Sequence, residues 1–122
     1  MSQEEYPIPV LRPEVMIDDF EKIDIRVGKI LSAKQLPKAK KPAYALEIDF
    51  GPLGIKHSSA QITVYYTPET LVGKRILAVV NFPPRRIAGF VSEVLTLGIP
   101  DAAGAVALIH PDIDAPLGSQ LF

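Results

Sequence analysis

The sequence has no cysteine, no tryptophan, two histidines and no long hydrophobic run. Without cysteine there is no disulfide, no thiolate nucleophile and no cysteine-ligated zinc. No apolar stretch approaches the roughly 18 residues that a membrane-spanning helix requires. The first twenty residues lack the basic and apolar regions of a secretory signal peptide, since they contain Glu4, Glu5, Glu14, Asp18 and Asp19. At 122 residues the chain is long enough for one domain, and these absences predict a cytoplasmic protein without a membrane span.

The net charge of −1 conceals an uneven distribution of charge along the chain. Residues 25–92 contain eleven Lys or Arg and three acids, a balance of 11 − 3 = +8. Residues 1–24 and 93–122 are both acidic. This pattern indicates either a positive surface for a polyanion or acidic ends that fold back and neutralise the middle. Charge alone leaves both open.

Residues 1–17 are predicted to form an extended arm that precedes a domain at 18–122. Prolines at positions 7, 9 and 13 favour extended backbone and oppose helix. The apolar Ile8, Val10 and Leu11 predict that the arm packs on its own domain or on a partner subunit. Asp18 and Glu21 have the spacing of a capping box, which predicts a short helical turn.

The domain is predicted to be all-β. Apolar residues alternate most regularly at 44–50, and Gly28 is predicted to mark a β-bulge in the first strand. Strands are expected at 25–30, 44–50, 55–58, 75–82 and 90–97, with a last apolar strand at 105–109 and a short helix within 59–66. A helix between the third and fourth strands is the layout of a five-stranded OB-fold barrel with terminal extensions, although alternation by itself also fits a small β-sandwich.

The sequence offers little for catalysis. His57 and Ser58 are adjacent, and neighbours in a strand point to opposite faces, so they are not expected to form a nucleophile–base pair. Asp112 and Asp114 are too few for a metal site and are interpreted as a solvated turn. No phosphate-binding glycine loop is present. We predict a binding module, not an enzyme, without cofactor or metal.

Residues 81–89 are the most distinctive segment. Pro83 and Pro84 are expected to stiffen a loop that presents Arg85 and Arg86, whose guanidinium groups match phosphate oxygens. Phe82 and Phe90 could stack on bases, but they close and open apolar strands and are therefore assigned to the core.

A second basic loop joins the first two predicted strands and carries Lys38, Lys40 and Lys41. In OB-folds this region lies near the nucleic-acid-binding face. The complete set of predicted RNA-binding residues is Arg85, Arg86, Lys40, Lys41, Lys38, Lys56, Ser58, Ser59, Gln61 and Asn81.

Four segments in the same order resemble the structure-specific tRNA-binding domain family: residues 24–30, 49–51, 66–74 and 81–89. Four ordered motifs are far more specific than one. This domain is appended to some methionyl-tRNA synthetases and phenylalanyl-tRNA synthetase β-chains, and also occurs as free-standing dimers. The resemblance covers residues 18–110 and implies an OB-fold with tRNA as partner.

Residues 56–62 and 81–90 are similar to the CsaA subfamily of export-related chaperones. That resemblance implies a homodimer joined through the chain ends, with a role in protein secretion through binding of unfolded or presecretory polypeptides in an apolar groove. Apolar residues near both termini fit such an interface: Ile8, Val10, Leu11, Leu117, Leu121 and Phe122. The arm is longer than expected for the subfamily, and His57 replaces an expected glutamine. The alternative is a protein–protein docking module with no RNA role.

Overall fold

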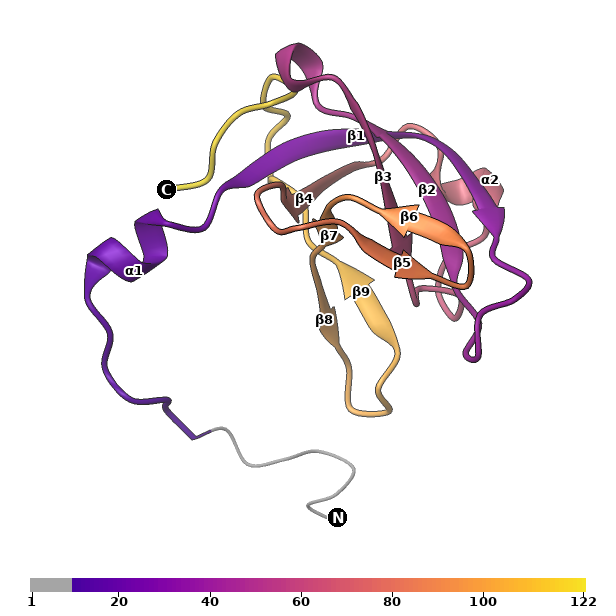
Figure 1. Cartoon of the computed structure of the whole chain (residues 1–122), viewed down its shortest axis with the longest axis horizontal. Helices are drawn as coiled ribbons and strands as arrows, with labels where there is room; N and C mark the ends of the chain where they lie inside the picture. Colours follow the sequence, from indigo (N-terminus) through magenta and orange to yellow (C-terminus); the bar gives the residue numbers. More distant parts are fainter. Residues whose placement is uncertain (1–9) are drawn as a thin grey trace.

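The computed structural model describes residues 10–122, so most of the predicted arm lies outside the described residues (Figure 1). It has two short α-helices, one 3-10 turn (η1) and nine strands within that range. In chain order these are α1 (Ile17–Glu21), β1 (Ile25–Gln35), β2 (Tyr44–Asp49), η1 (Gly51–Leu53), β3 (Ile55–Ala60), α2 (Pro68–Leu71), β4 (Arg75–Val79), β5 (Arg85–Ile87), β6 (Phe90–Ser92), β7 (Leu95–Thr96), β8 (Gly98–Pro100) and β9 (Val106–Leu108).

The main sheet curls into a nearly closed barrel. Its five strands are antiparallel in the order β3-β2-β1-β4-β7. The two outer strands, β3 and β7, come into contact where the barrel closes. The Thr96 hydroxyl of β7 donates a hydrogen bond to the Ser58 hydroxyl of β3 over 2.8 Å. A single curled sheet with a helix between β3 and β4 confirms the OB-fold and rules out the β-sandwich.

The ends of the strands differ from the prediction. The expected strand at 75–82 stops at Val79, and the one at 90–97 is divided into β6 and β7. Only β7 joins the barrel, whereas β6 pairs with β5 in a separate hairpin. The last strand, β9, pairs with β8 in a second hairpin. In Figure 1 the β5–β6 hairpin lies in front of the barrel, and the β8–β9 hairpin extends below it.

The alternation in β2 produces the core. Tyr44, Leu46 and Ile48 are buried, whereas the residues between them are partly exposed. Gly28 of β1 lies against this core, and a Cβ there would be 2.5 Å from Cγ2 of Ile48 and 2.7 Å from Cε1 of Phe50. The predicted bulge at Gly28 is therefore wrong. The glycine provides room for the core, and the irregularity lies further along β1, between residues 30 and 32.

Both helices begin elsewhere than predicted. Ser59 and Ala60 extend β3 in place of the helix expected within 59–66. The helix α2 starts at Pro68, where Thr67 caps it by accepting a hydrogen bond from the Thr70 N–H at 3.3 Å. At α1 the predicted Asp18 cap is wrong, because the helix begins at Ile17 and its N-cap is Met16. The Asp19 carboxylate accepts a hydrogen bond from the Met16 N–H.

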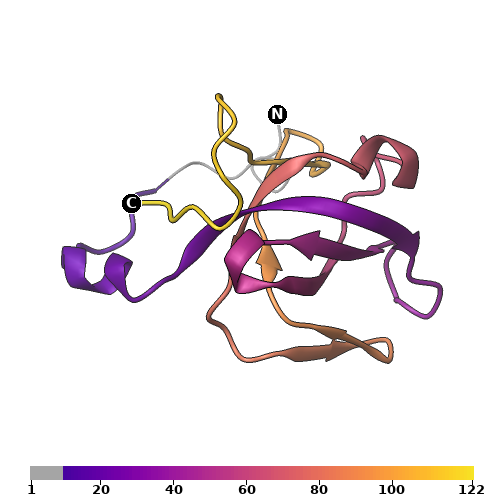
Figure 2. The same cartoon turned by 90° about the horizontal axis from the view of Figure 1, so that it is seen from above.

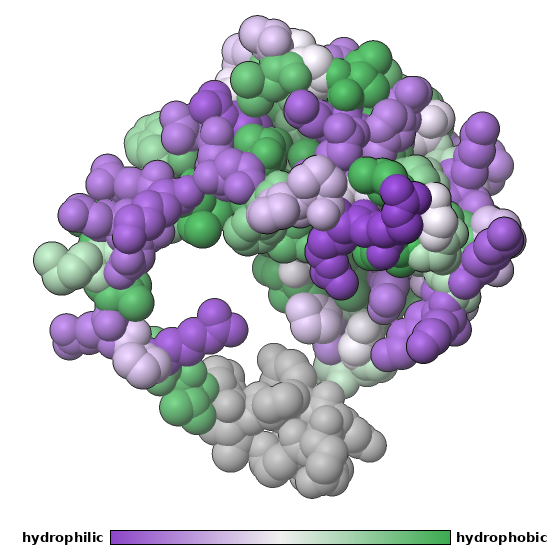
Figure 3. Space-filling model, viewed as in Figure 1, coloured by the Kyte–Doolittle hydropathy of each residue, from purple (hydrophilic) through white to green (hydrophobic). Residues whose placement is uncertain are grey.

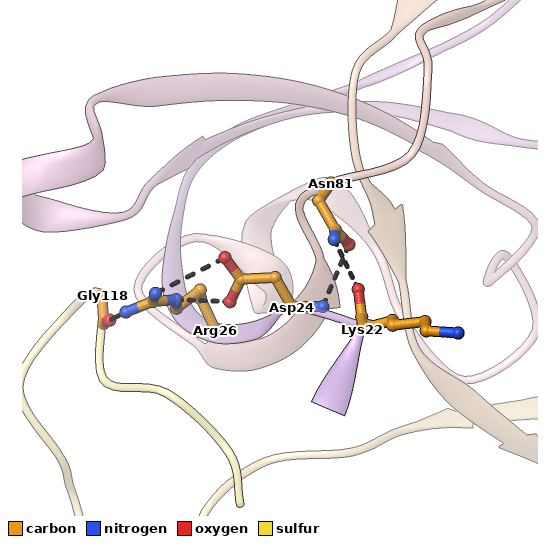
Figure 4. Close-up of polar contacts among 5 residues, drawn as sticks. All are labelled: Lys22, Asp24, Arg26, Asn81 and Gly118. Atoms are coloured by element: carbon orange, nitrogen blue, oxygen red, sulfur yellow. Dashed lines mark hydrogen bonds and ion pairs between the residues drawn. The ribbon is translucent and has the colours of Figure 1, made fainter. Parts of the chain in front are cut away.

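The start of β1 is tied to two distant parts of the chain (Figure 4). The Arg26 guanidinium contacts the Asp24 carboxylate at 2.6 Å and donates to the Gly118 carbonyl at 3.0 Å. The Asn81 side chain donates to the Lys22 carbonyl at 2.8 Å and accepts from the Asp24 N–H at 3.0 Å. Asp24, Arg26 and Asn81 belong to two of the family-like motifs, so at these positions the motifs hold the fold together.

The described part of the arm does not pack on the barrel. Val10 is 81% exposed and Leu11 is 96% exposed. Figures 1 and 2 both show α1 and the arm projecting from one end of the barrel, with the C-terminus beside α1. Residues 10–16 therefore do not cover their own domain in this structure, and the alternative, that the arm packs on a partner subunit, stays a prediction. No helix within residues 10–122 has the length and apolarity needed to cross a membrane.

Candidate functional site

A groove of about 900 Å³ runs between the β1–β2 loop, the end of β3 and the β5–β6 hairpin. It combines basic side chains with an apolar lining. Basic groups come from the loop and from β5, and apolar groups come from the hairpin itself and from the segments before and after it. The lining residues are Lys38, Ala39, Lys40, Lys41, Ala43, Ser59, Ala60, Gln61, Phe82, Pro83, Arg85, Arg86, Ile87, Ala88, Ser92, Glu93, Val94 and Leu95.

The two arginines are carried by a strand and not by the predicted loop. Arg85 and Arg86 belong to β5, which pairs with β6 through a tight turn at Ala88 and Gly89. Both turn residues have positive φ, 51° and 81°. Although consecutive strand residues leave the backbone on opposite sides, both arginine side chains line the groove. Both side chains are exposed.

The opposite rim is the β1–β2 loop. Lys38, Lys40 and Lys41 are exposed there, as predicted for a basic loop. Backbone hydrogen bonds shape the loop: the Leu36 N–H donates to Ala43 at 3.0 Å, and the Ala39 N–H donates to Leu36 at 3.2 Å. The loop starts only at residue 36, since β1 continues to Gln35.

The groove cations lack anionic partners within the described chain. All ion pairs found among residues 10–122 involve other basic residues: Lys22, Arg26, His57 and Arg75. Five positive side chains facing one groove repel each other and attract an anion. The rims are therefore suited electrostatically to a polyanionic ligand.

The groove lining also contains exposed apolar surface. Phe82 is 44% exposed and lines the groove, together with Ile87, Val94 and Leu95. Figure 3 shows strongly hydrophilic side chains beside hydrophobic surface over the β5–β6 hairpin. The assignment of Phe82 and Phe90 to the core is wrong. Phe82 follows the end of β4 and does not belong to a strand. The Phe90 ring packs edge-on against the His57 ring, with 6.1 Å between the ring centroids.

His57 and Glu93 attach the hairpin to the barrel. The His57 Nδ1–H donates to the Glu93 carboxylate at 3.0 Å, and the His57 backbone N–H donates to the same oxygen at 2.9 Å. This hydrogen bond is the main reason that the pKa of Glu93 lies below its ordinary value of 4.5. The Ser59 N–H also donates to the Ser92 hydroxyl at 3.0 Å. These contacts fix the arginine-bearing hairpin over β3.

Most of the predicted binding residues line this groove. Besides the five cations, Ser59 and Gln61 border it. Three predicted residues do not: Lys56, Ser58 and Asn81. Ser58 is fully buried and its hydroxyl accepts from Thr96, so it cannot reach a ligand on the surface.

Asn81 and Lys56 are placed elsewhere for different reasons. The Asn81 amide hydrogen-bonds the backbone of residues 22 and 24 through both its oxygen and its nitrogen, and so ties residue 81 to the start of β1. Lys56 lies on β3 away from the groove lining. Two groove-lining residues that the predicted binding set did not include are Phe82 and Glu93. For Phe82 the two prolines after it were a usable signal, because they end the strand; Glu93 had none, since its partner is 36 positions away.

The described residues do not assemble a metal-binding cluster. Within residues 10–122 there is no group of three His, Cys, Asp or Glu side chains able to hold a metal ion. His57 and Ser58 point to opposite sides of β3, as predicted, with one on the surface and the other buried. Asp114 is exposed and contacts Arg75 at 3.6 Å.

The sequence matches a family model described as "Putative tRNA binding domain" over residues 25–120. Its structure is similar to that of the chaperone CsaA from Bacillus anthracis, with 49% identity, a TM-score of 0.84 and coverage of 90% of this chain and 100% of that one. The CsaA chaperone protein from Picrophilus torridus is also 49% identical, with a TM-score of 0.83 and coverage of 89% and 100%.

Among curated relatives, the chain is 36% identical over 111 residues to a methionine–tRNA ligase of Chloroherpeton thalassium. The match covers 91% of this chain but only 16% of the ligase. The chain therefore spans only about one sixth of that relative's length.

Proposed function

The chain belongs to the tRNA-binding domain family, and we propose that it binds folded tRNA in the groove between the β1–β2 loop and the β5–β6 hairpin. The observation that carries this proposal is the set of five groove cations without ion-pair partners among residues 10–122. Phosphates supply most of the affinity of nucleic-acid binding and contact Lys and Arg preferentially.

The separation of the cations favours recognition of backbone shape. Lys38, Lys40 and Lys41 lie on one rim and Arg85 and Arg86 on the other, so the two rims can contact phosphates on either side of a strand. The exposed Phe82 ring offers a stacking face to an unpaired base. Ser59 and Gln61 provide neutral hydrogen-bonding groups at the end of β3. None of these contacts requires a particular base, which fits binding by backbone and shape.

Binding of fluorescent total tRNA at several salt concentrations tests the proposal. If all five cations contact phosphates, the logarithm of affinity should fall with the logarithm of salt with a slope of about −3.5 to −4.5. The double variant Arg85→Ala/Arg86→Ala should bind more weakly and reduce the magnitude of the slope by about 2.

The matched control removes two positive charges outside the groove, in Lys34→Ala/Lys74→Ala. It should keep most of the wild-type slope, because neither residue lines the groove. If the arginine variant and wild type bind tRNA equally at moderate salt, the assignment of the groove is wrong.

The apolar lining supports a second activity, the binding of unfolded polypeptides. Phe82, Ile87, Val94 and Leu95 form apolar surface within the same groove, and the structurally similar proteins from B. anthracis and P. torridus are named as chaperones. Unlike tRNA binding, suppression of aggregation through this surface should depend little on salt. Phe82→Ser should reduce suppression of aggregation more than Arg85→Ala does. The opposite ranking would contradict an apolar mode.

We also propose that the protein is a homodimer joined through its chain ends. Met16, Ile17 and Phe20 around α1 are exposed, and so is Phe122 at the C-terminus beside it. Such a patch is costly in water and typical of an interface. Light scattering should report a dimer for the wild type and a monomer for Ile17→Asp/Phe20→Asp.

If the groove binds neither tRNA nor unfolded polypeptide, the docking-module alternative becomes the preferred one. Tagged protein should then recover a defined partner protein by co-purification. Any role in secretion, like the cytoplasmic location, stays a prediction.

A further inference from the structure

We propose that His57 is a positioning residue for the groove, and that protonation of its ring fastens the β5–β6 hairpin to β3 and strengthens tRNA binding. Because the proposal concerns regulation of the groove, it rests on the proposed tRNA-binding function. His57 does not line the groove, so it acts through the hairpin that carries Arg85 and Arg86.

His57 is the principal attachment point of the hairpin. The hairpin forms a two-stranded sheet of its own, separate from the barrel sheet. Five hydrogen bonds join residues 85–94 to the rest of the described chain, and four of them involve His57. The His57 carbonyl accepts from the N–H groups of Glu93 at 2.7 Å and Val94 at 3.2 Å. The His57 backbone N–H and the His57 ring both donate to the Glu93 carboxylate. The position of the hairpin therefore depends on this one residue.

The His57 ring lies between two carboxylates. Nδ1 is 3.0 Å from the Glu93 carboxylate, and Nε2 is 4.0 Å from the Glu47 carboxylate on β2. A neutral ring that donates from Nδ1 turns the lone pair of Nε2 toward Glu47, whereas a protonated ring donates from both nitrogens. The positive charge of the protonated ring also attracts both carboxylates. The protonated ring therefore holds the hairpin more firmly than the neutral ring does.

The other charged groups around the ring keep their charge between about pH 6 and about pH 8, since lysines and arginines stay protonated and carboxylates stay ionised there. Lys56 precedes His57 on β3, and its charge acts on Glu93. The hydrogen bond from His57 keeps the pKa of Glu93 below its ordinary value of 4.5. Ser32 of β1 donates to the second oxygen of Glu47 at 3.5 Å. Histidine is the side chain that ordinarily changes charge in this range, so the ring is the titrating part of the junction.

A firmly held hairpin favours tRNA binding. It keeps the two arginines at a constant distance from the lysines of the opposite rim, so less conformational entropy is lost when tRNA binds. An ion pair between partly exposed side chains changes an equilibrium by a factor of up to about five. We therefore expect tRNA to bind about two- to fivefold more tightly at about pH 6 than at about pH 8.

The first test measures the affinity for fluorescent total tRNA at both pH values and constant ionic strength. His57→Gln should remove most of the pH dependence, because glutamine can still donate to Glu93 but does not titrate. The chain has only one other histidine, His110, which is exposed and lies outside the groove lining. His110→Gln is therefore the matched control and should keep the wild-type pH dependence. Equal pH dependence in the wild type and in His57→Gln would overturn the proposal.

A second test distinguishes positioning from direct attraction of tRNA by the charge on His57. Arg85→Ala/Arg86→Ala should lose the pH dependence, because the hairpin then carries no cation to position. Lys40→Ala/Lys41→Ala removes the same number of charges from the opposite rim, which His57 does not hold, and should keep the pH dependence. If both variants keep it, protonation acts through charge alone and His57 is not a positioning residue.

Hydrogen exchange in the protein without tRNA separates failure of this proposal from failure of tRNA binding. The Glu93 and Val94 amides bond to the His57 carbonyl, so their protection factors report opening of the junction. After correction for the intrinsic pH dependence of exchange, both factors should be about two- to fivefold higher at about pH 6 than at about pH 8 in the wild type, and equal in His57→Gln. Unchanged protection in the wild type would refute the proposal even if tRNA binds normally. Protection that depends on pH, without any tRNA binding, would support the coupling of His57 to the hairpin and refute the proposed ligand.

Discussion

Replacement of Gly28 by alanine is a sharp test of the barrel's packing. Gly28 lies in regular β1 pairing opposite Ile76, and its φ is not in the left-handed region. At such a position alanine usually stabilises a protein by about 0.4–1 kcal/mol, because it restricts the unfolded chain. Here the added Cβ would meet Cγ2 of Ile48 at 2.5 Å and two ring carbons of Phe50 at 2.7 and 2.9 Å.

Both neighbours belong to the fully buried core, at 0% exposure, so neither can move into solvent. The strands must separate or the core side chains must leave their preferred rotamers, at a cost of about 1–3 kcal/mol. For a domain of this size each kcal/mol corresponds to roughly 4 °C in Tm. We therefore expect Gly28→Ala to lower Tm by about 4–12 °C, a change opposite in sign to the ordinary effect.

Denaturation by urea, followed by circular dichroism, measures the effect on the free energy of unfolding. Gly54→Ala is the comparison, since a Cβ at Gly54 meets nothing within 4 Å and its φ of 89° makes the cost purely backbone strain. The double variant Gly28→Ala/Ile48→Ala should cost less than the sum of the single variants, because removing Cγ2 relieves one clash. If Gly28→Ala is as stable as the wild type, the steric explanation of this glycine is wrong.

Three further predictions concern side-chain hydrogen bonds that stabilise the fold. The hydrogen bond from His57 lowers the pKa of Glu93, so the ionised Glu93 carboxylate stabilises the folded protein. This contribution to the free energy of unfolding is fully present above the ordinary pKa of 4.5 and is lost as the pH falls through the lowered pKa. Melting curves at several pH values should therefore show a smaller acid-induced loss of Tm for Glu93→Gln. Asn81→Ala removes two hydrogen bonds to backbone and should cost about 1–2 kcal/mol in urea denaturation, whereas unchanged stability would contradict its structural role. Thr67→Ala removes the cap of α2 and should cost about 1 kcal/mol, and Thr67→Ser should restore most of it.

The residues that made the family recognisable serve mainly the fold. Arg26 binds Asp24 and the C-terminal segment, Gly28 leaves room for the core, and Asn81 links the β4–β5 connection to the start of β1. This explains how the motifs identified the family while three of the predicted binding residues, Lys56, Ser58 and Asn81, lie outside the groove lining. Residues of a family motif can therefore stabilise the fold without contacting a ligand.

The sequence by itself determined the features that depend on neighbours along the chain. Alternation over Tyr44–Asp49 identified a half-buried strand, because side chains in a strand point to opposite faces with a period of two. The order of strands and helix determined the OB-fold, and the uneven distribution of charge located the basic segment.

Only the tertiary structure decided which residues meet. Pairing of β5 with β6 placed Arg85 and Arg86 on a strand, and closure of the barrel between β3 and β7 buried Ser58. The His57–Glu93 contact joins positions 36 residues apart, and the groove forms only when the β1–β2 loop lies opposite that hairpin. Local periodicity cannot specify these contacts, because the register and curvature of the sheet result from packing of the whole core.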